Sequence, residues 1–200
     1  MIKAVVFDMD GVLVDATEMH RSAFEQALPP NLRAKAVQDR EALEGRPTKV
    51  KLQMLGLSGQ EAIEAANRKQ EITLALAQSL RQDNRAIKAV KAALDCAGSV
   101  GVCTNSIRRT TEAMLRATGV WPYIDAIVTN EDVDAPKPDP SGYSFCFACL
   151  LVDPSEVLVI EDTDLGFSAA VAAGAHVVKV AAIEDVTDTN VRKWVSLLNG

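Results

Sequence analysis

Long hydrophobic runs are missing from the sequence, and so is any excess of basic residues. The apolar stretches are far shorter than the ~20 residues that a membrane-spanning helix needs, and residues 1–7 have neither the length nor the cleavage site of a signal peptide. The 21 Lys and Arg residues are outnumbered by 27 Asp and Glu, for a net charge of −6, so there is no broad cationic surface for a nucleic-acid backbone. We therefore expect a cytoplasmic monomer or homodimer that binds neither membranes nor nucleic acids.

The motifs of several common protein classes are absent too. The chain contains no G-x-x-x-x-G-K-[ST] phosphate loop, no G-x-G-x-x-G dinucleotide fingerprint and no G-x-S-x-G nucleophile elbow. Cys146 and Cys149 are spaced like a redox pair, but they fall in an apolar stretch that predicts a buried helix, where cysteine commonly serves as a small hydrophobic residue. A calcium loop beginning at Asp8 would need glycine at its sixth position and an acid at its twelfth, whereas Gly11 is fourth and Met19 is twelfth.

What the sequence does contain is a regular alternation of strands and helices. Helical patterns of about 10 to 15 residues follow most of the β-rich runs, which predicts parallel pairing and right-handed crossovers in an open, Rossmann-like α/β sheet. Ligands of such sheets bind beyond the carboxyl ends of the strands. The expected strands are 2–7, 99–103, 126–129, 157–160 and 176–180, and the expected helices of this part are 84–97, 107–118, 140–151, 164–173 and 189–198.

One segment breaks the alternation. Residues 16–82 contain no convincing strand, and their helical patterns are separated by prolines and glycines. We expect helices at 18–28, 37–43, 48–55 and 58–80. Because this segment follows the first strand directly, it can cover the strand ends and exclude water from them. The predicted organisation is a small α-helical cap domain, 16–82, inserted into a core made of 1–15 and 83–200.

Polar residues gather where the predicted strands end, and acids predominate among them. Carboxyl ends of parallel strands share one edge of a sheet, so these side chains should lie close together. An excess of carboxylates is stable around a hard cation, and an oxygen-rich set with room for water and substrate suits Mg²⁺. A carboxylate can also act as a nucleophile toward phosphorus. The residues concerned are Asp8, Asp10, Thr104, Asn105, Ser106, Glu161 and Asp162, with Lys137 fixed among the prolines of 135–140.

These residues occur in motifs whose order resembles the haloacid dehalogenase superfamily of phosphohydrolases. The resemblance covers about residues 1–15 and 83–200. A lone D-x-D would be weak evidence, whereas several ordered motifs at strand ends are specific. The motifs are Asp8-Met-Asp10-Gly11-Val-Leu-Val-Asp15, Cys103-Thr104-Asn105-Ser106, Lys137-Pro-Asp-Pro140, Glu161-Asp162-Thr163-Asp-Leu-Gly166 and Ala172-Ala173-Gly174.

The resemblance implies a role for each matching residue. Asp8 would be the nucleophile and a metal ligand. Asp10 would protonate the leaving oxygen and then take a proton from water, while its backbone carbonyl binds Mg²⁺. Lys137 would offset charge in the transition state. Asp162 and Glu161 would complete the metal site, Glu161 either as a ligand or as a carboxylate behind the ligands. Thr104 and the backbone of Asn105 would hold phosphoryl oxygens, and Ser106 would bind substrate.

The position of the helical segment resembles the subgroup that contains phosphoglycolate phosphatase and β-phosphoglucomutase. Residues 45–51 resemble the specificity loop of that cap. Substrate-binding candidates in the segment are His20, Arg46, Lys49 and Lys69, and a solvated surface is the alternative for each. The predicted function is a Mg²⁺-dependent phosphatase for a small phosphorylated metabolite, such as a sugar phosphate or phosphoglycolate, acting through an aspartyl phosphate. A phosphomutase, a dehalogenase and a non-catalytic module are the alternatives.

Overall fold

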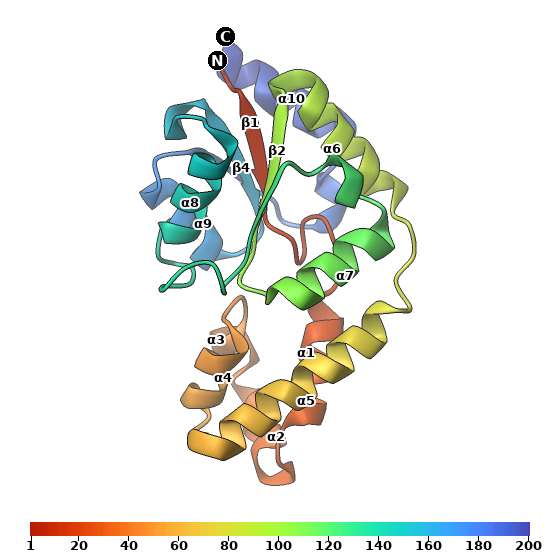
Figure 1. Ribbon diagram of the computed structural model, residues 1–200, viewed down its shortest axis with the longest axis vertical. Coiled ribbons are helices and arrows are strands. Elements are labelled where there is room, and N and C mark those ends of the chain that lie inside the picture. The colour runs from red at the N-terminus through yellow and green to blue at the C-terminus, as the bar shows by residue number, and fades with distance from the viewer.

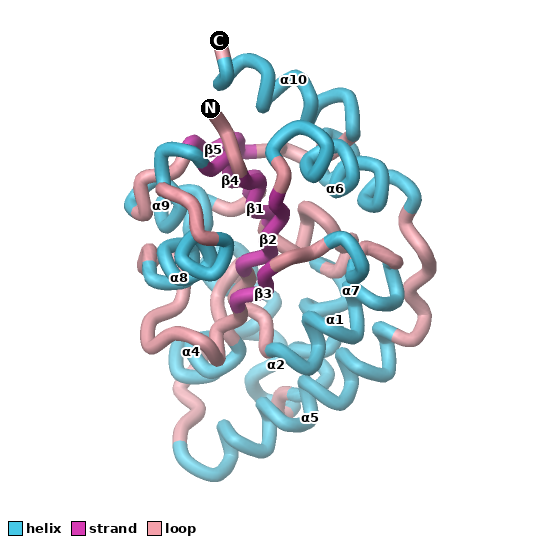
Figure 2. The backbone as a smooth tube through the Cα atoms, turned by 45° about the horizontal axis from the view of Figure 1, so that its top comes forward, coloured by secondary structure: helices cyan, strands magenta, loops and turns pink.

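The computed structural model describes residues 1–200 and contains the expected parallel α/β sheet. Five strands pair in the order β3-β2-β1-β4-β5, which can be followed in Figure 2. The strands are β1 (Ala4–Phe7), β2 (Ser99–Cys103), β3 (Ala126–Val128), β4 (Val157–Glu161) and β5 (His176–Lys179). The predicted fold class is therefore confirmed.

Helices cover both faces of the sheet, which explains why its central strand is apolar along its whole length. In Figure 1, α6, α7 and α10 lie on one side of the strands, and α8 and α9 lie on the other. All four residues of β1 are fully buried, as expected for a parallel strand enclosed by two helical layers. The helices are α6 (Asn84–Ala97), α7 (Arg108–Thr118), α8 (Ser141–Leu150), α9 (Asp164–Ala172) and α10 (Asp188–Asn199).

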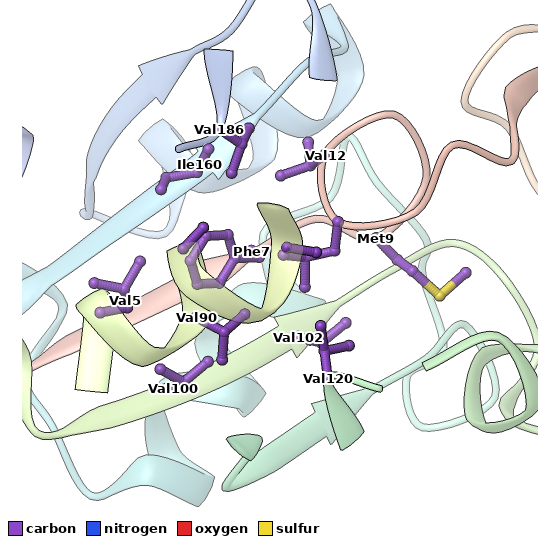
Figure 3. Close-up of a cluster of buried hydrophobic side chains, with 14 of the residues drawn as sticks. Val5, Phe7, Met9, Val12, Val90, Val100, Val102, Val120, Ile160 and Val186 are labelled. Carbon is purple, nitrogen blue, oxygen red and sulfur yellow. The ribbon is translucent and has the colours of Figure 1, made fainter. Parts of the chain in front are cut away.

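Each face of the sheet has its own apolar cluster. Val5 and Phe7 point toward α6 and α10, whereas Ala4 and Val6 point toward α8 and α9, because successive side chains of a strand face opposite ways. Figure 3 shows Phe7 among side chains from β2, β4 and α6. This packing fixes β1 between β2 and β4.

The register of β1 with its neighbours positions the site. Phe7 pairs with Val102 of β2 and with Ile160 of β4. The residues that follow these three pairing partners therefore emerge at the same level, at one edge of the sheet. The backbone N–H of Asp8 still donates to the carbonyl of Ile160, at 2.9 Å, so Asp8 is held by the sheet itself.

The segment after β1 is helical, as predicted, and has an apolar cluster of its own. It contains α1 (Thr17–Ala27), α2 (Pro30–Gln38), α3 (Arg40–Leu43), α4 (Thr48–Met54) and α5 (Gly59–Ala77). Figure 1 shows these helices beyond one end of the strands. The cluster supports the division into a cap, 16–82, and a core, 1–15 and 83–200, which stays a proposal.

One part of this segment differs from the prediction. We expected Pro29 and Pro30 to separate two helices, with the next helix at 37–43. Instead Pro30 is the first residue of α2, because proline suits the first helical position, where its missing N–H costs no hydrogen bond. A break at Asp39 then divides the expected helix between α2 and α3.

No helix of the structure combines the length and the apolar character that crossing a membrane requires.

Candidate active site

A cavity of about 730 Å³ lies between the strand ends and the helical segment. Only three of its 29 lining residues are hydrophobic, so it suits a polar ligand. Its lining includes nearly all of the predicted site residues, namely Asp8, Asp10, His20, Arg46, Lys49, Lys69, Thr104, Asn105, Ser106, Lys137 and Asp162. Glu161 is the one predicted residue that does not line it, because its side chain is fully buried beneath the floor.

Three acids, two at the floor of the cavity and one buried beneath it, form a group that fits a hard cation. Asp8, Glu161 and Asp162 each offer an oxygen, and these oxygens lie within 4.8 Å of one another. Asp162 Oδ1 is buried and has no hydrogen-bond partner, a state that costs free energy unless a cation or another donor satisfies it. Gly11 leaves room for the carboxylate of Asp162, since a Cβ at this position would lie 2.2 Å from Asp162 Oδ2. The donor set is therefore suited to Mg²⁺.

The same crowding shifts the pKa values of these acids. Burial raises the pKa of Asp8 well above its ordinary value, Lys137 offsets part of this effect, and Glu161 and Asp162 add to it. Burial, followed by the charge of Glu161, raises the pKa of Asp162 to about 6. Extra positive charge at this place would favour the ionised form of both side chains.

Lys137 is the only base within this acidic group, and it is itself buried. Its Nζ lies 2.6 Å from Asp8 Oδ1 and 2.5 Å from Glu161 Oε1. It also donates to the carbonyl oxygen of Cys103 at 2.8 Å and to the hydroxyl of Tyr143 at 3.0 Å. Burial alone would lower the pKa of Lys137, but the charges of Asp8 and Glu161 outweigh that and raise it. Lys137 therefore stays cationic.

Both oxygens of Glu161 are already engaged by the protein. Oε1 accepts from Lys137 and, at 2.7 Å, from the hydroxyl of Tyr143. Oε2 accepts from the backbone N–H of Asp162 at 3.1 Å and of Thr163 at 3.3 Å. Glu161 thus orients Lys137 in this structure, and its part as a metal ligand stays a prediction.

Tyr143 was not singled out in the sequence, because it lies in an apolar stretch that indicates a core helix. The available signal was its hydroxyl, since a buried phenol generally needs a hydrogen-bond partner. Burial, together with the neighbouring charge of Glu161, raises the pKa of Tyr143 well above its usual value. The phenol therefore stays protonated and donates a hydrogen bond to Glu161.

Asp10 has quite different surroundings, although it is only two residues from Asp8. Its Oδ1 lies 3.0 Å from His20 Nε2, and its Oδ2 accepts from Ser106 Oγ at 2.9 Å. Burial would raise the pKa of Asp10, but the interactions with His20, Ser106 and Lys69 outweigh it and leave this pKa below its ordinary value. Asp10 therefore carries a carboxylate that is satisfied by hydrogen bonds and stands apart from the acidic group.

His20 links Asp10 to the helical segment. Its Nδ1 lies 2.9 Å from Nζ of Lys69 in α5. A lysine ammonium only donates, so Nδ1 accepts, and the proton on Nε2 is the one that points to Asp10. Burial lowers the pKa of Lys69 to about 8, in spite of the opposing charge of Asp10. The sequence placed His20 and Lys69 among possible substrate contacts, and the structure brings both to Asp10.

The remaining predicted substrate-binding residues are Arg46, Lys49 and Asn105. Arg46 donates from Nε to the carbonyl of Ala42 at 2.9 Å, and Lys49 is exposed at the cavity wall. Asn105 connects the two sides of the cavity, because its Nδ2 donates to the carbonyl of Gly45 at 2.8 Å. Its Oδ1 accepts from the backbone N–H of Lys137 at 3.0 Å. The Asn105 side chain is thus occupied by protein partners.

Comparisons with known proteins identify the family and the fold of this chain. A family model described as haloacid dehalogenase-like hydrolase matches residues 5–180. Fructose-1-phosphate phosphatase YqaB of Escherichia coli (strain K12) is 30% identical over 178 residues, which are 88% of this chain and 95% of that protein. Validoxylamine A 7'-phosphate phosphatase of Streptomyces hygroscopicus subsp. limoneus is 28% identical over 193 residues, 92% of this chain and 88% of that one. The crystal structure of β-phosphoglucomutase from Clostridium difficile has the same fold, with a TM-score of 0.81, 18% identity and 98% coverage of each chain.

Proposed function

This chain belongs to the haloacid dehalogenase-like hydrolase family and is a phosphoric monoester hydrolase, and from that premise we propose that it is a Mg²⁺-dependent phosphatase for a small phosphorylated metabolite. The observation that carries the proposal is the contrast between Asp8 and Asp10. Asp8 lies in the acidic group beside Lys137, whereas Asp10 is bound to His20 and Ser106. Two neighbouring carboxylates with different environments suit two different chemical tasks.

The proposed metal ligands are Asp8, Asp162 and the backbone carbonyl of Asp10, with Glu161 as a further candidate. When bound, Mg²⁺ would supply positive charge between the anionic nucleophile and the anionic phosphoryl group. Lys137 adds a fixed positive charge at Asp8 Oδ1, 2.6 Å away. The closely spaced oxygens and the unpaired Asp162 Oδ1 support this assignment.

Catalysis would proceed in two displacements through an aspartyl phosphate. In the first, a carboxylate oxygen of Asp8 forms a bond to phosphorus as the bond to the substrate oxygen breaks, and Asp10 gives its proton to that leaving oxygen. In the second, Asp10 takes a proton from water. The water oxygen then bonds to phosphorus, the bond to Asp8 breaks, and phosphate leaves.

This cycle requires Asp10 to gain and lose a proton, and its contacts suit that task. The pKa of Asp10 lies below its ordinary value, so Asp10 has to receive a proton before it can act as the acid of the first displacement. The hydrogen-bonded pair of Lys69 and His20 ends at Asp10 Oδ1 and gives it a donor on the side of the helical segment. We assign His20 and Lys69 to proton supply at Asp10.

The remaining residues would bind the phosphoryl group and the rest of the substrate. The start of the β2–α7 loop, residues 104–106, lines the same cavity as Asp8 and offers the Thr104 hydroxyl and the backbone N–H of Asn105 as donors. Arg46 and Lys49 would contact the far end of the substrate from the cavity wall. The polar lining and the volume of about 730 Å³ suit a sugar phosphate or a phosphoglycolate-like compound. The names of two relatives, a fructose-1-phosphate phosphatase and a validoxylamine A 7'-phosphate phosphatase, support the sugar phosphate.

The test is phosphate release from a panel of phosphorylated metabolites, with Mg²⁺ and with a chelator. Wild type should hydrolyse at least one sugar phosphate only with Mg²⁺, and Asp8→Asn should release none. Asp95→Asn, at an exposed acid in α6, is the matched control and should retain full activity. Lys49→Ala should change the ranking of substrates. Release that persists unchanged in Asp8→Asn, or no release from any compound by wild type, would contradict the proposal.

A phosphomutase is the alternative within this fold. It would transfer the phosphoryl group from Asp8 to a second hydroxyl of the sugar instead of to water. Product analysis with β-glucose 1-phosphate and a bisphosphate primer separates the two reactions. The formation of an isomer without phosphate release would favour the mutase.

A further inference from the structure

The ammonium of Lys137 has acceptors from four different parts of the chain. They are Asp8 Oδ1 after β1, the Cys103 carbonyl at the end of β2, the Tyr143 hydroxyl in α8 and Glu161 Oε1 at the end of β4. An ammonium has three N–H donors, so these acceptors share them. The position of Nζ is therefore set jointly by groups that lie on different sides of it.

These acceptors are not equally permanent. In the proposed reaction an oxygen of Asp8 becomes esterified, which exchanges the carboxylate charge that attracts Lys137 for the charge of a phosphoryl group that stays only until the second displacement. The Cys103 carbonyl and the Tyr143 hydroxyl keep their character throughout. Glu161 also persists, and its carboxylate is itself held by the Tyr143 hydroxyl at 2.7 Å.

Tyr143 contacts Lys137 from outside the cavity. Its side chain is fully buried and does not line the cavity, so it cannot touch the substrate. Its ring packs on Phe147, with ring centroids 6.2 Å apart, and Nζ of Lys137 lies 4.6 Å from its ring centroid. The hydroxyl accepts from Lys137 at 3.0 Å while donating to Glu161. The hydroxyl is therefore hydrogen-bonded to both members of the ion pair between Lys137 and Glu161.

We propose that Tyr143 is a positioning residue whose hydroxyl holds Lys137 over the phosphoryl site while Asp8 is esterified. The proposal rests on the proposed function of Lys137 and Asp8. Without the hydroxyl, the fixed acceptors that the lysine of the phosphorylated enzyme keeps are the Cys103 carbonyl and Glu161, and Glu161 itself loses the hydrogen bond from Tyr143. The ammonium of Lys137 is then less restrained during the second displacement, which loses stabilisation of its charge. In the first displacement the carboxylate of Asp8 still holds the ammonium in place.

The kinetic test uses Tyr143→Phe, which removes one oxygen and leaves the ring packed on Phe147. The hydroxyl bonds to charged groups, so we expect kcat to fall about 10- to 100-fold, with KM within about threefold of wild type. Tyr123→Phe is the matched control, because Tyr123 is the only other tyrosine and lies over Lys91, away from the cavity. It should leave both constants unchanged. A kcat of Tyr143→Phe within about twofold of wild type would overturn the proposal.

A double-mutant cycle separates positioning from a general effect on the fold. If Tyr143 acts through Lys137, adding Tyr143→Phe to Lys137→Ala should change the single-turnover rate by less than about twofold. A full additional loss in the double variant would mean that Tyr143 acts independently, and would refute the inference.

A spectroscopic readout makes the inference independent of turnover. In protein labelled with ¹⁵N-lysine, an ammonium held by several acceptors exchanges its protons slowly, and the Lys137 signal is identified by its loss in Lys137→Met. The measurement is made in the Asp8→Asn background, where this side chain has a carbonyl oxygen but no charge, as it does in the ester. There we expect the signal with Tyr143 intact and with Tyr123→Phe, and its broadening or loss with Tyr143→Phe. A signal that is unchanged in Tyr143→Phe would refute positioning even if wild type proved to have no phosphatase activity, whereas that inactivity would refute only the proposed function.

Discussion

Replacing Lys69 with methionine should stabilise the protein at neutral pH, although Lys69 lies in the proposed site. The side chain is 7% exposed, and its only hydrogen-bond partner is His20 Nδ1. Burial lowers the pKa of Lys69 from 10.5 to about 8. The charged form of Lys69 is therefore less stable in the folded protein than in the unfolded chain. Methionine fills a similar volume without that charge.

The magnitude follows from the pKa difference. The difference between a pKa of 10.5 and one of about 8 corresponds to roughly 3 to 4 kcal/mol. The lost hydrogen bond to His20 costs about 1 kcal/mol. We therefore expect the free energy of unfolding of Lys69→Met to exceed that of wild type by roughly 2 kcal/mol at pH 7.

The sign of the pH dependence is specific. Below pH 8 both the folded and the unfolded wild type carry the charge, so the full penalty is present. As the pH rises from about 8 toward 10.5, the folded state loses its proton before the unfolded state does, and wild type gains stability. The advantage of Lys69→Met should therefore shrink to about zero near pH 10.

Urea unfolding followed by far-ultraviolet circular dichroism, at pH 7 and pH 10 in metal-free buffer, measures both quantities. Lys88→Met, at an exposed position of α6, is the control and should show neither the gain nor its pH dependence. The same Lys69→Met variant should hydrolyse substrate more slowly, because His20 loses the donor that orients it. A variant that is no more stable than wild type at pH 7, or equally stabilised at both pH values, would refute the reasoning.

Two further substitutions address how the site is held together. A Cβ in Gly166→Ala would lie 1.7 Å from Glu161 Oε1, so the buried carboxylate must move; we expect a loss of roughly 2 kcal/mol in urea unfolding and a lower kcat, and unaltered stability would contradict the packing described. Asn105→Ala removes the bonds to the Gly45 carbonyl and to the backbone N–H of Lys137. It should speed hydrogen exchange in α4 and leave α6 unchanged; equal exchange in α4 would show that Asn105 does not tie the two sides together.

Much of the fold could be predicted because its signals are local. The buried strand Ala4–Phe7 reads as an unbroken apolar run, and polar residues mark the point where it ends. Parallel pairing then requires that the ends of β1, β2 and β4 meet at one edge. The acidic group of Asp8, Glu161 and Asp162 could be expected on that basis alone.

The rest depended on contacts between residues far apart in the sequence. Asp8 and Asp10 have no basic neighbour along the chain, yet Lys137 binds one and His20 the other. The partner of His20, Lys69, is 49 residues away. No periodicity of either helix specifies that contact, because it follows from how α1 and α5 pack on each other. The start of α2 at Pro30 was missed for a local reason, since proline can open a helix as well as end one.

The cavity has two walls that come from different stretches of the chain, and this has a practical use in laboratory evolution. The strand ends supply every group that would meet the phosphorus atom. Exposed or half-exposed side chains of the facing wall, such as Arg46, Lys49, Gln53, Asn67 and Gln70, hold no part of that machinery. A library randomised only at these positions could be screened for new substrates with the reaction left intact. Selection would then act on substrate recognition alone, while the residues that carry out the reaction stay fixed.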